Sequence, residues 1–504
     1  MALRRPTTDD LHLLAATHHF ELSKEEVEAY QALIPGMFEA LDALDQAPTN
    51  VPTITYHERD PGRRPSRQED PLNAIIRRCS VKGAKSGKLT GKRIGIKDNV
   101  CIAGIPMTCA SLVLDGYVPD IDATIITRIL DAGGEITAVL NMDNFAFSGG
   151  GDTSTYGPIR NPHNPEHLAG GSSGGSGAAL YCTDIDLTIG GDQGGSIRIP
   201  ASWCGVVGLK PTHSLVPYTG IVGIDPTFDH IGPMARSVAD TALLLEVIAG
   251  KDPMDPRQYD VSVQPYIQVL SKNIRGIRLG VLREGFGTPV SEPDVDTKVR
   301  EAIKALQELG AQVQEVSVPA HLEAGGITWG LITEGMAASI YGSGVGHHWQ
   351  GLYNVSLANA LGKSLQAQAQ DLPYQLKFVL LMGTYLNKAY HGRLYAKAQN
   401  QRRTLRAAYD DVLQHLDVLV MPTTPNKAHK YDPKRNIREL IEHGWNMLGN
   451  TAPFDMTGHP SLSVPCGKSN GLPVGLMLTG RHFDDATLLR VGYAFEQQMS
   501  WERR

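Results

Sequence analysis

The 504-residue sequence has no long hydrophobic run and only six cysteines, and each shortage excludes a class of protein. No stretch of about 18 apolar residues occurs, so a membrane-spanning helix is not expected. The N-terminal segment has no apolar core of the kind found in signal peptides, which argues against secretion. The cysteines form no CxxC pair, a pattern typical of free thiols in a reducing compartment. We therefore expect a cytoplasmic protein without a membrane partner.

An excess of positive charge is also missing. Lys and Arg total 47 against 53 Asp and Glu, and the formal net charge is -6 at pH 7. No basic field is therefore available to hold a polyanion, and we expect no nucleic acid partner. One short basic cluster lies in a proline-rich stretch with acidic residues between its members, which is typical of a solvated connection. It consists of Arg59, Arg63, Arg64 and Arg67.

Residues 9–45 have the spacing of two amphipathic helices. The second is expected to begin after Ser23, because Glu26 stands at the position of a capping box. A proline-rich linker follows at about 46–70. We therefore expect an N-terminal helical extension and linker at 1–70. Its apolar face would pack either on the main body or against a second copy, giving a homodimer.

Residues 71–504 alternate short apolar runs with helical patterns, as in KRIGIK, DATIITRILDAG and EITAVLNM. This alternation predicts an α/β fold with a central mixed β-sheet covered by helices on both faces. We expect one large domain, because no convincing linker interrupts it. The region at about 325–400 is more helical and would form an insertion beside the active site.

Two glycine-serine runs stand out, GGSSGGSGAAL from residue 170 and GGDQGGSIRIPASWCG from residue 190. Such runs are often flexible linkers, but both lie between strongly apolar segments. A phosphate-binding loop is a weak alternative, because neither run ends in GK[ST]. GGSSG also matches the nucleophile elbow GxSxG of α/β-hydrolases, yet the required preceding strand is replaced by the polar RNPHNPEHLA.

The segment DQGGS brings together two requirements of amide hydrolysis, a hydroxyl nucleophile and N–H donors for the oxyanion. Ser196 supplies the hydroxyl. The glycines have no side chains, so neighbouring backbone N–H groups can converge on one point. The predicted donors are Gln193, Gly194, Gly195 and Ser196.

The general base is harder to find. His163, His167, His213 and His230 lie in the same stretch, but no spacing favours one of them as a base or metal ligand. A buried lysine with a lowered pKa can also accept a proton. Lys97 is a candidate because it ends the apolar run RIGI, although a lysine at a strand end is usually solvated.

Taken together, these segments resemble the amidase-signature family. The resemblance rests on GGSSGG at 170–175, on a second serine 24 residues after Ser172 in GGSIRIP, and on Lys97 in GIKDN. It continues in segments such as CGVVGLKPT and DVLVMPTTP, and covers nearly everything from residue 70 to the end.

The resemblance implies a role for each residue. Ser196 would be the nucleophile, Ser172, on a cis peptide bond, the proton relay, and Lys97 the base. Ser173 would support this network by hydrogen bonding. Asp192 and Arg198 would hold the loop. No metal and no cofactor are implied.

The resemblance leaves the substrate open. The helical extension and segments such as NTAPFDMTGHPSLSVP look like acylamidases that accompany nitrile hydratases, which favours small aliphatic or aromatic amides. Phe147, Trp329 and Leu448 would line the acyl pocket. Carbamates, anilides, esters and hydrazides remain alternatives with the same chemistry. Two further alternatives are the glutaminase subunit of a tRNA-dependent amidotransferase and a non-catalytic member of the fold.

Overall fold

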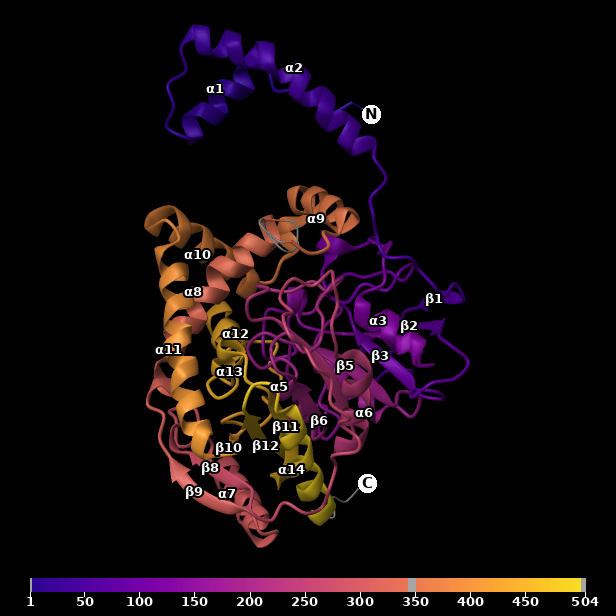
Figure 1. Ribbon diagram of the computed structural model, residues 1–504, viewed down its shortest axis with the longest axis vertical. Helices are drawn as coiled ribbons and strands as arrows, with labels where there is room; N and C mark the ends of the chain where they lie inside the picture. Colours follow the sequence, from indigo (N-terminus) through magenta and orange to yellow (C-terminus); the bar gives the residue numbers. More distant parts are fainter. Residues whose placement is uncertain (1, 343–349, 500–504) are drawn as a thin grey trace. The chain divides into compact units, whose positions relative to one another are not determined.

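The described part of the computed structural model comprises residues 2–342 and 350–499 (Figure 1). Two units, Met1–Pro52 and Thr53–Arg504, make up the chain. No helix in the described ranges is long and apolar enough to cross a lipid bilayer.

The smaller unit contains α1 (Thr8–Thr17) and α2 (Lys24–Gln46). At the start of α2 the N–H of Glu26 donates to Ser23 Oγ at 3.2 Å, and the N–H of Ser23 donates to the Glu26 carboxylate at 2.8 Å. The predicted capping box is therefore present. On α2, Val27 and Ile34 are buried.

Residues 53–70 belong to the larger unit, although they were expected to form part of a linker. Arg59–Arg63 forms strand β1, which pairs antiparallel with β2 (Ile75–Lys82). The guanidinium of Arg59 also binds the Asp122 carboxylate at 2.6 Å, and both side chains are largely buried. This strand pairing and ion pair attach the segment to the larger unit.

A sheet of twelve strands runs through the larger unit in the order β1-β2-β4-β3-β5-β7-β6-β11-β12-β10-β8-β9. Parallel and antiparallel pairs both occur, so the sheet is mixed. The remaining strands are β3 (Arg93–Lys97), β4 (Glu135–Leu140), β5 (Leu187–Asp192), β6 (Val207–Lys210), β7 (His230–Ala235), β8 (Arg278–Leu282), β9 (Gln312–Val316), β10 (Val418–Pro422), β11 (Ser461–Ser469) and β12 (Leu472–Gly480).

Alternate residues of the strands face two different helical layers, as the period of a β-strand requires. On β5, Leu187 and Ile189 join the largest apolar cluster, which also contains residues of α3 (Thr124–Asp131), α6 (Val238–Ile248), α7 (Pro293–Glu308) and α14 (Asp485–Gln498). Thr188 points to the opposite face and donates to a carbonyl of α4 (Gly174–Ala178) at 2.9 Å. The predicted α/β fold is confirmed.

The face that carries α4 also carries α5 (Arg198–Cys204), α8 (Ala320–Tyr341), α11 (Arg393–His415) and α13 (Ala452–Thr457). Helix α8 packs against both α10 (Tyr374–Tyr390) and α11 (Figure 1). The predicted helical region at about 325–400 therefore lies largely in helices, with α9 (Val355–Gln368) between α8 and α10. Its residues 343–349 lie outside the described ranges. The remaining α-helix is α12 (Ile437–His443).

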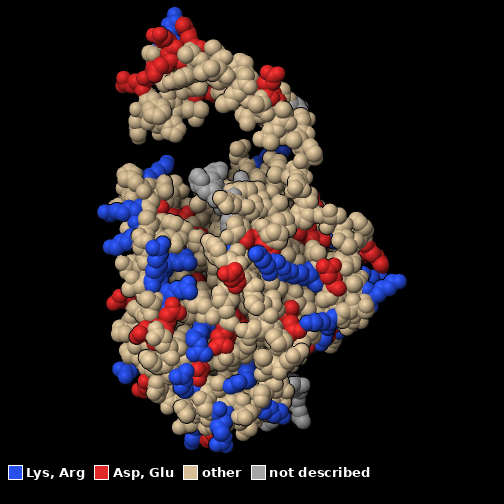
Figure 2. Space-filling view, in the orientation of Figure 1, with Lys and Arg blue, Asp and Glu red and all other residues tan. Residues whose placement is uncertain are grey.

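Positive and negative side chains are interspersed over the face of the larger unit seen in Figure 2. Two members of the basic cluster of the sequence, Arg59 and Arg63, have acidic partners. Arg63, for example, binds the Glu69 carboxylate at 2.5 Å. The charges on this face therefore show no concentration of one sign that would favour a polyanion.

Candidate active site

The predicted reacting residues meet at the carboxyl ends of two neighbouring strands. β3 runs parallel to β5, with Ile94 opposite Leu187. Lys97 is the last residue of β3 and Asp192 the last of β5. The Lys97 side chain and the loop after Asp192 therefore lie at one edge of the sheet, where open α/β sheets commonly place their sites.

Lys97 is fully buried and hydrogen-bonded to a predicted partner. Its Nζ donates to Ser172 Oγ at 2.7 Å and to the Gly191 carbonyl at 3.4 Å. Burial lowers the pKa of Lys97 to about 7, although the carboxylates of Asp143 and Asp192 act in the opposite direction. Near neutral pH much of this side chain is therefore a free amine, the form that can accept a proton.

The first glycine-serine run is a packed turn and not a linker. Its residues from 169 to 180 are buried, and the peptide bond between Gly171 and Ser172 is cis. A Cβ atom at Gly171 would lie 1.8 Å from the Asp143 carboxylate, so this position excludes any side chain. Helix α4 begins two residues after Ser172.

Ser173 connects this turn to the segment that carries Ser196. Its N–H donates to the Ser196 carbonyl at 3.2 Å, and its Oγ donates to the Gly191 carbonyl at 2.9 Å. The described residues contain no direct hydrogen bond between the side chains of Ser172 and Ser196. The structure thus joins Lys97 to Ser172 through their side chains, and reaches Ser196 through the backbone of Ser173.

Ser196 lies in a tight loop between β5 and α5 that is built around the carboxylate of Asp192. This carboxylate accepts from the N–H of Gly195 at 2.5 Å and from that of Ile197 at 3.1 Å. The guanidinium of Arg198 binds Asp192 at 2.9 Å and Asp455 at 2.6 Å, and all three side chains are fully buried. Burial alone would raise the pKa of Asp192, but Arg198 holds it well below its usual range. The ionised carboxylate therefore fixes the loop.

Three of the four predicted oxyanion donors remain free. The N–H groups of Gln193, Gly194 and Ser196 have no hydrogen-bond partner among the described residues. The prediction for Gly195 is wrong, because its N–H is directed to the Asp192 carboxylate. Gly195 instead allows the turn, since it has φ +138° and a Cβ atom there would lie 2.3 Å from Thr451 Oγ1.

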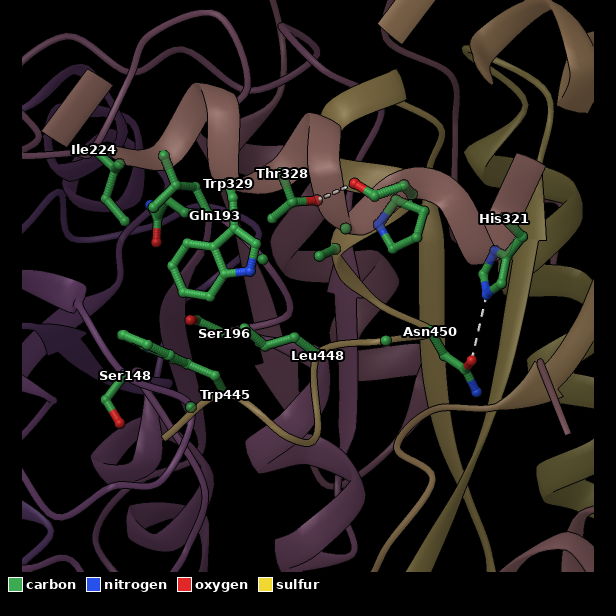
Figure 3. A pocket seen from close by; sticks show the side chains of 18 of the residues that line it. Ser148, Gln193, Ser196, Ile224, His321, Thr328, Trp329, Trp445, Leu448 and Asn450 are labelled. Atoms are coloured by element: carbon green, nitrogen blue, oxygen red, sulfur yellow. Dashed lines mark hydrogen bonds between the residues drawn. The ribbon is translucent and has the colours of Figure 1, made fainter. Parts of the chain in front are cut away.

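Ser196 opens into a cavity of about 280 Å³ (Figure 3). The predicted pocket residues Phe147, Trp329 and Leu448 all line it. Trp445, which was not predicted, meets both other aromatic rings edge-on, with ring centroids 6.3 Å from Phe147 and 4.6 Å from Trp329. The wall beside Ser196 is therefore aromatic and apolar.

The other end of the cavity is polar. Figure 3 shows His321 and Asn450 on the far side of the cavity from Trp445, and Glu284 also lines it. Burial lowers the pKa of His321 to about 4, so this ring is neutral. No Lys or Arg occurs among the described lining residues. An anionic substituent of a substrate would find no cationic partner here.

The four histidines considered as bases, His163, His167, His213 and His230, do not line this cavity in the described structure. The rings of His213 and His230 pack edge-on at 5.2 Å, and burial lowers the pKa of both well below the usual value. They are structural residues, which leaves Lys97 as the base candidate beside Ser172.

Sequence reasoning missed Trp445 and His321. Trp445 precedes the predicted Leu448 on one short segment and could have been found by extending the pocket along it. The sequence around His321 does not indicate that this residue lines the cavity, because its position is determined by the packing of α8 against Tyr409 and Phe454.

Comparisons with known proteins give similarities that extend over most of the chain. The family model described as Amidase matches residues 73–489. An enantioselective amidase of Rhodococcus rhodochrous is 42% identical over 441 residues, covering 86% of this chain and 84% of that protein. A glutamyl-tRNA(Gln) amidotransferase subunit of Lysinibacillus sphaericus is 38% identical, covering 83% and 85%. The peptide amidase of Stenotrophomonas maltophilia superimposes with a TM-score of 0.69 at 28% identity, covering 85% and 89%.

Proposed function

The chain belongs to the amidase family and hydrolyses carboxamides, and from this premise we propose that Ser196, Ser172 and Lys97 carry out the reaction. The observation that supports this assignment best is the 2.7 Å contact between the buried Lys97 and Ser172. Through this contact a weakly basic amine lies next to the hydroxyl of Ser172. The N–H of the following residue, Ser173, donates to the carbonyl of Ser196.

In the first half of the reaction Ser196 Oγ attacks the amide carbonyl carbon. Its proton passes to Ser172 Oγ while the Ser172 proton passes to the neutral amine of Lys97. The carbonyl electron pair moves onto oxygen, and the free N–H groups of Gln193, Gly194 and Ser196 stabilise the oxyanion. Each such donor contributes on the order of 3 kcal/mol in the transition state.

In the second half Lys97 returns its proton through Ser172 to the leaving nitrogen. The C–N bond breaks, ammonia or an amine departs, and the acyl group remains as an ester on Ser196. Water then attacks this acyl-enzyme, with the same relay accepting the proton of the water. The bond between the acyl carbon and Ser196 Oγ then breaks, Lys97 returns the proton through Ser172 to Ser196 Oγ, and the carboxylic acid is released.

We propose small aliphatic and aromatic amides as substrates. The volume of about 280 Å³ is at the small end of ligand cavities, and the aromatic wall beside Ser196 suits an apolar acyl group. Anilides, esters, carbamates and hydrazides of the same size are reactive in the same geometry.

Glutamine is a poorer fit, although relatives named as amidotransferase subunits are almost as similar as the amidase. Its α-carboxylate would enter a cavity whose described lining offers neither Lys nor Arg. An unpaired charge in such a site costs at least about 1–3 kcal/mol. We therefore favour an amidase that acts without a partner protein.

Ammonia release by the purified chain alone tests this function. We expect hydrolysis of benzamide and of a short aliphatic amide, with kcat/KM for L-glutamine lower by about tenfold or more. A preference for glutamine would refute the substrate assignment. Activity that appeared only after addition of a second protein would favour the amidotransferase alternative.

Trp445→Ala is expected to lower kcat/KM for benzamide by about tenfold, because the edge-on contacts with Phe147 and Trp329 and part of the apolar wall are lost. Acetamide, which has no ring to pack there, should change much less. Trp445→Phe retains a ring and should recover part of the benzamide activity. Equal losses for both substrates in Trp445→Ala would contradict a role in acyl recognition.

The pH profile should report the protonation of Lys97. Its pKa is lowered to about 7, and only the neutral amine accepts a proton, so kcat/KM should fall as the pH drops below about 7. Lys210 is the matched control, because burial also lowers its pKa to about 7 but its Nζ donates to the His459 carbonyl. The acidic limb should persist in Lys210→Met. A rate that is independent of pH from mildly acidic to alkaline conditions would exclude a neutral lysine base.

Two expectations about the whole protein remain proposals. All six cysteines are unbridged, which supports a reducing compartment such as the cytoplasm.

Apolar residues of α2 such as Leu33 and Leu44 are exposed, which supports association of two copies through the N-terminal helices. Light scattering should then give a dimer for the full chain and a monomer for a chain that begins at Thr53. The same oligomeric state for the two proteins would refute this interface.

A further inference from the structure

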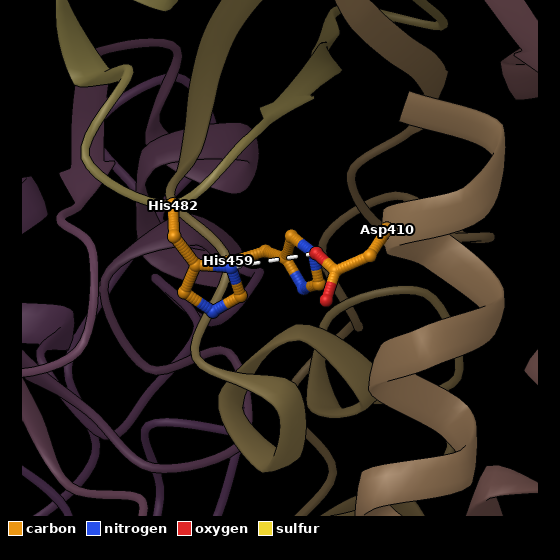
Figure 4. A group of neighbouring side chains, drawn as sticks. All are labelled: Asp410, His459 and His482. Atoms are coloured by element: carbon orange, nitrogen blue, oxygen red, sulfur yellow. Dashed lines mark hydrogen bonds and ion pairs between the residues drawn. The ribbon is translucent and has the colours of Figure 1, made fainter. Parts of the chain in front are cut away.

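Three side chains outside the amidase cavity converge on one point (Figure 4). Asp410 comes from α11, His459 from the connection between α13 and β11, and His482 from the turn after β12. One nitrogen of each imidazole and one oxygen of the carboxylate all lie within 4.8 Å of one another. In the part of the chain that the structure describes, this is the one group of His, Cys, Asp or Glu residues whose arrangement could hold a metal ion.

The ring of His482 has a defined tautomer. Its Nε2 lies 3.0 Å from the Thr457 carbonyl, which can only accept, so Nε2 carries the hydrogen. In the neutral ring Nδ1 then has a lone pair. This nitrogen faces Asp410 Oδ1 at 3.6 Å, so two acceptors point at each other with no hydrogen between them.

His459 is oriented in the same way. The hydroxyl of Thr457 donates to the Pro453 carbonyl at 3.1 Å, and its oxygen lies 2.8 Å from His459 Nδ1. When the hydroxyl hydrogen is used in this way, Nδ1–H of His459 donates to this oxygen. In that tautomer the lone pair of Nε2 points at Asp410 Oδ1, 3.0 Å away, whereas in the other tautomer Nε2–H donates to this carboxylate and the ion takes the place of that hydrogen. Metal-binding histidines are commonly held by such a bond from their other ring nitrogen.

We propose that His459 Nε2, His482 Nδ1 and Asp410 Oδ1 bind a divalent transition-metal ion, with Zn²⁺ as the best-fitting ion. Ligand atoms about 2.0–2.1 Å from a tetrahedral ion are about 3.3 Å apart. The two nitrogen-to-oxygen separations, 3.0 Å and 3.6 Å, lie on either side of this value. Two imidazole nitrogens with one carboxylate oxygen are a donor set that Zn²⁺ accepts.

An ion can reach this site from solvent. Once it is bound to the three side chains, a fourth coordination position remains for water. His482 and Arg406 line a second cavity, of about 910 Å³, which provides a path from solvent. Arg406 Nε lies 3.4 Å from Oδ2 of Asp410, so the arginine engages the other carboxylate oxygen and leaves Oδ1 for the ion.

The ion would have a structural role. None of its three ligands lines the cavity that contains Ser196, so the ion takes no part in amide hydrolysis. Asp410 belongs to the helical layer, whereas His459 and His482 adjoin strands β11 and β12. The ion would therefore connect α11 to the sheet and stabilise the larger unit.

The test uses the full chain without a histidine tag, treated with chelator and then titrated with Zn²⁺. We expect one tightly bound equivalent by calorimetry and metal analysis, and a rise in Tm of about 2 °C or more. Co²⁺ bound at the same site should show the visible absorption of a low-coordinate ion. Wild-type protein that binds no Zn²⁺ would overturn the proposal.

Asp410→Asn and His482→Ala are expected to weaken Zn²⁺ binding at least about a hundredfold. His415→Ala is the matched control, because it removes an exposed imidazole from the same helix and should retain the bound equivalent. Asp410→Asn retains the shape of the side chain, and benzamide hydrolysis within about twofold of wild type shows that the variant is folded. Unchanged Zn²⁺ binding in both ligand variants would refute the site.

Discussion

Ser196→Ala is expected to lower kcat/KM for benzamide by about 10⁴-fold or more. The substitution removes only the attacking oxygen, and the loss of a serine nucleophile in comparable hydrolases has an effect of this size. The N–H donors and the cavity remain, so binding of benzamide should persist. Initial rates with enzyme stocks matched for folded protein measure the effect.

A neighbouring serine provides the control. Ser202 is buried on α5, with its Oγ 3.3 Å from Thr424 Oγ1, and it does not line the cavity. Ser202→Ala should therefore remain within a few-fold of wild type. Near-normal turnover by Ser196→Ala would refute the assignment of the nucleophile, and it would require a search for another hydroxyl in the same cavity.

Lys97→Met should reduce turnover almost as strongly, because the proton of Ser172 then has no acceptor. Methionine fills most of the buried volume of the lysine and leaves no large cavity, so a loss of activity can be separated from a loss of folding. The expected decrease in kcat/KM is about 10³-fold or more. Circular dichroism should give the folded spectrum, and steady-state rates should give the decrease.

The double variant Lys97→Met, Ser196→Ala sharpens this result. If the two residues act in one proton-transfer unit, the double variant should be no slower than the slower single variant. If the decrease in kcat/KM of the double variant equals the product of the two single decreases, Lys97 contributes independently of the nucleophile. In that case the relay through Ser172 would have to be abandoned.

The nucleophile segment was accessible to sequence reasoning because its parts are adjacent in the chain. Ser196 and the N–H groups of Gln193 and Gly194 lie on one loop, so glycine content and a hydroxyl were sufficient clues. The exception is Gly195, whose N–H is directed to Asp192. No rule of composition predicts which of four consecutive N–H groups a nearby carboxylate will take.

Lys97 and Ser172 were joined only by family resemblance. They are 75 residues apart, and their contact depends on β3 lying between β4 and β5. Strand order in a twelve-stranded sheet is not encoded in any local spacing. The same reason explains why the cluster of Asp410, His459 and His482 could not be found, since three distant segments contribute one residue each.

Apart from Phe147, the aromatic wall of the cavity comes from stretches of the chain that do not contain the reacting groups. The reacting groups lie between Lys97 and Ser196, whereas Trp329 belongs to α8 and Trp445 and Leu448 follow α12. Mutations in these two stretches can therefore reshape most of the aromatic wall without changing the segment that holds the nucleophile. A combinatorial library restricted to 324–332 and 445–449 would alter substrate choice and leave Thr451, which hydrogen-bonds to the Gly194 carbonyl, in place to hold the nucleophile loop. Recombination between relatives could exchange the same stretches as cassettes.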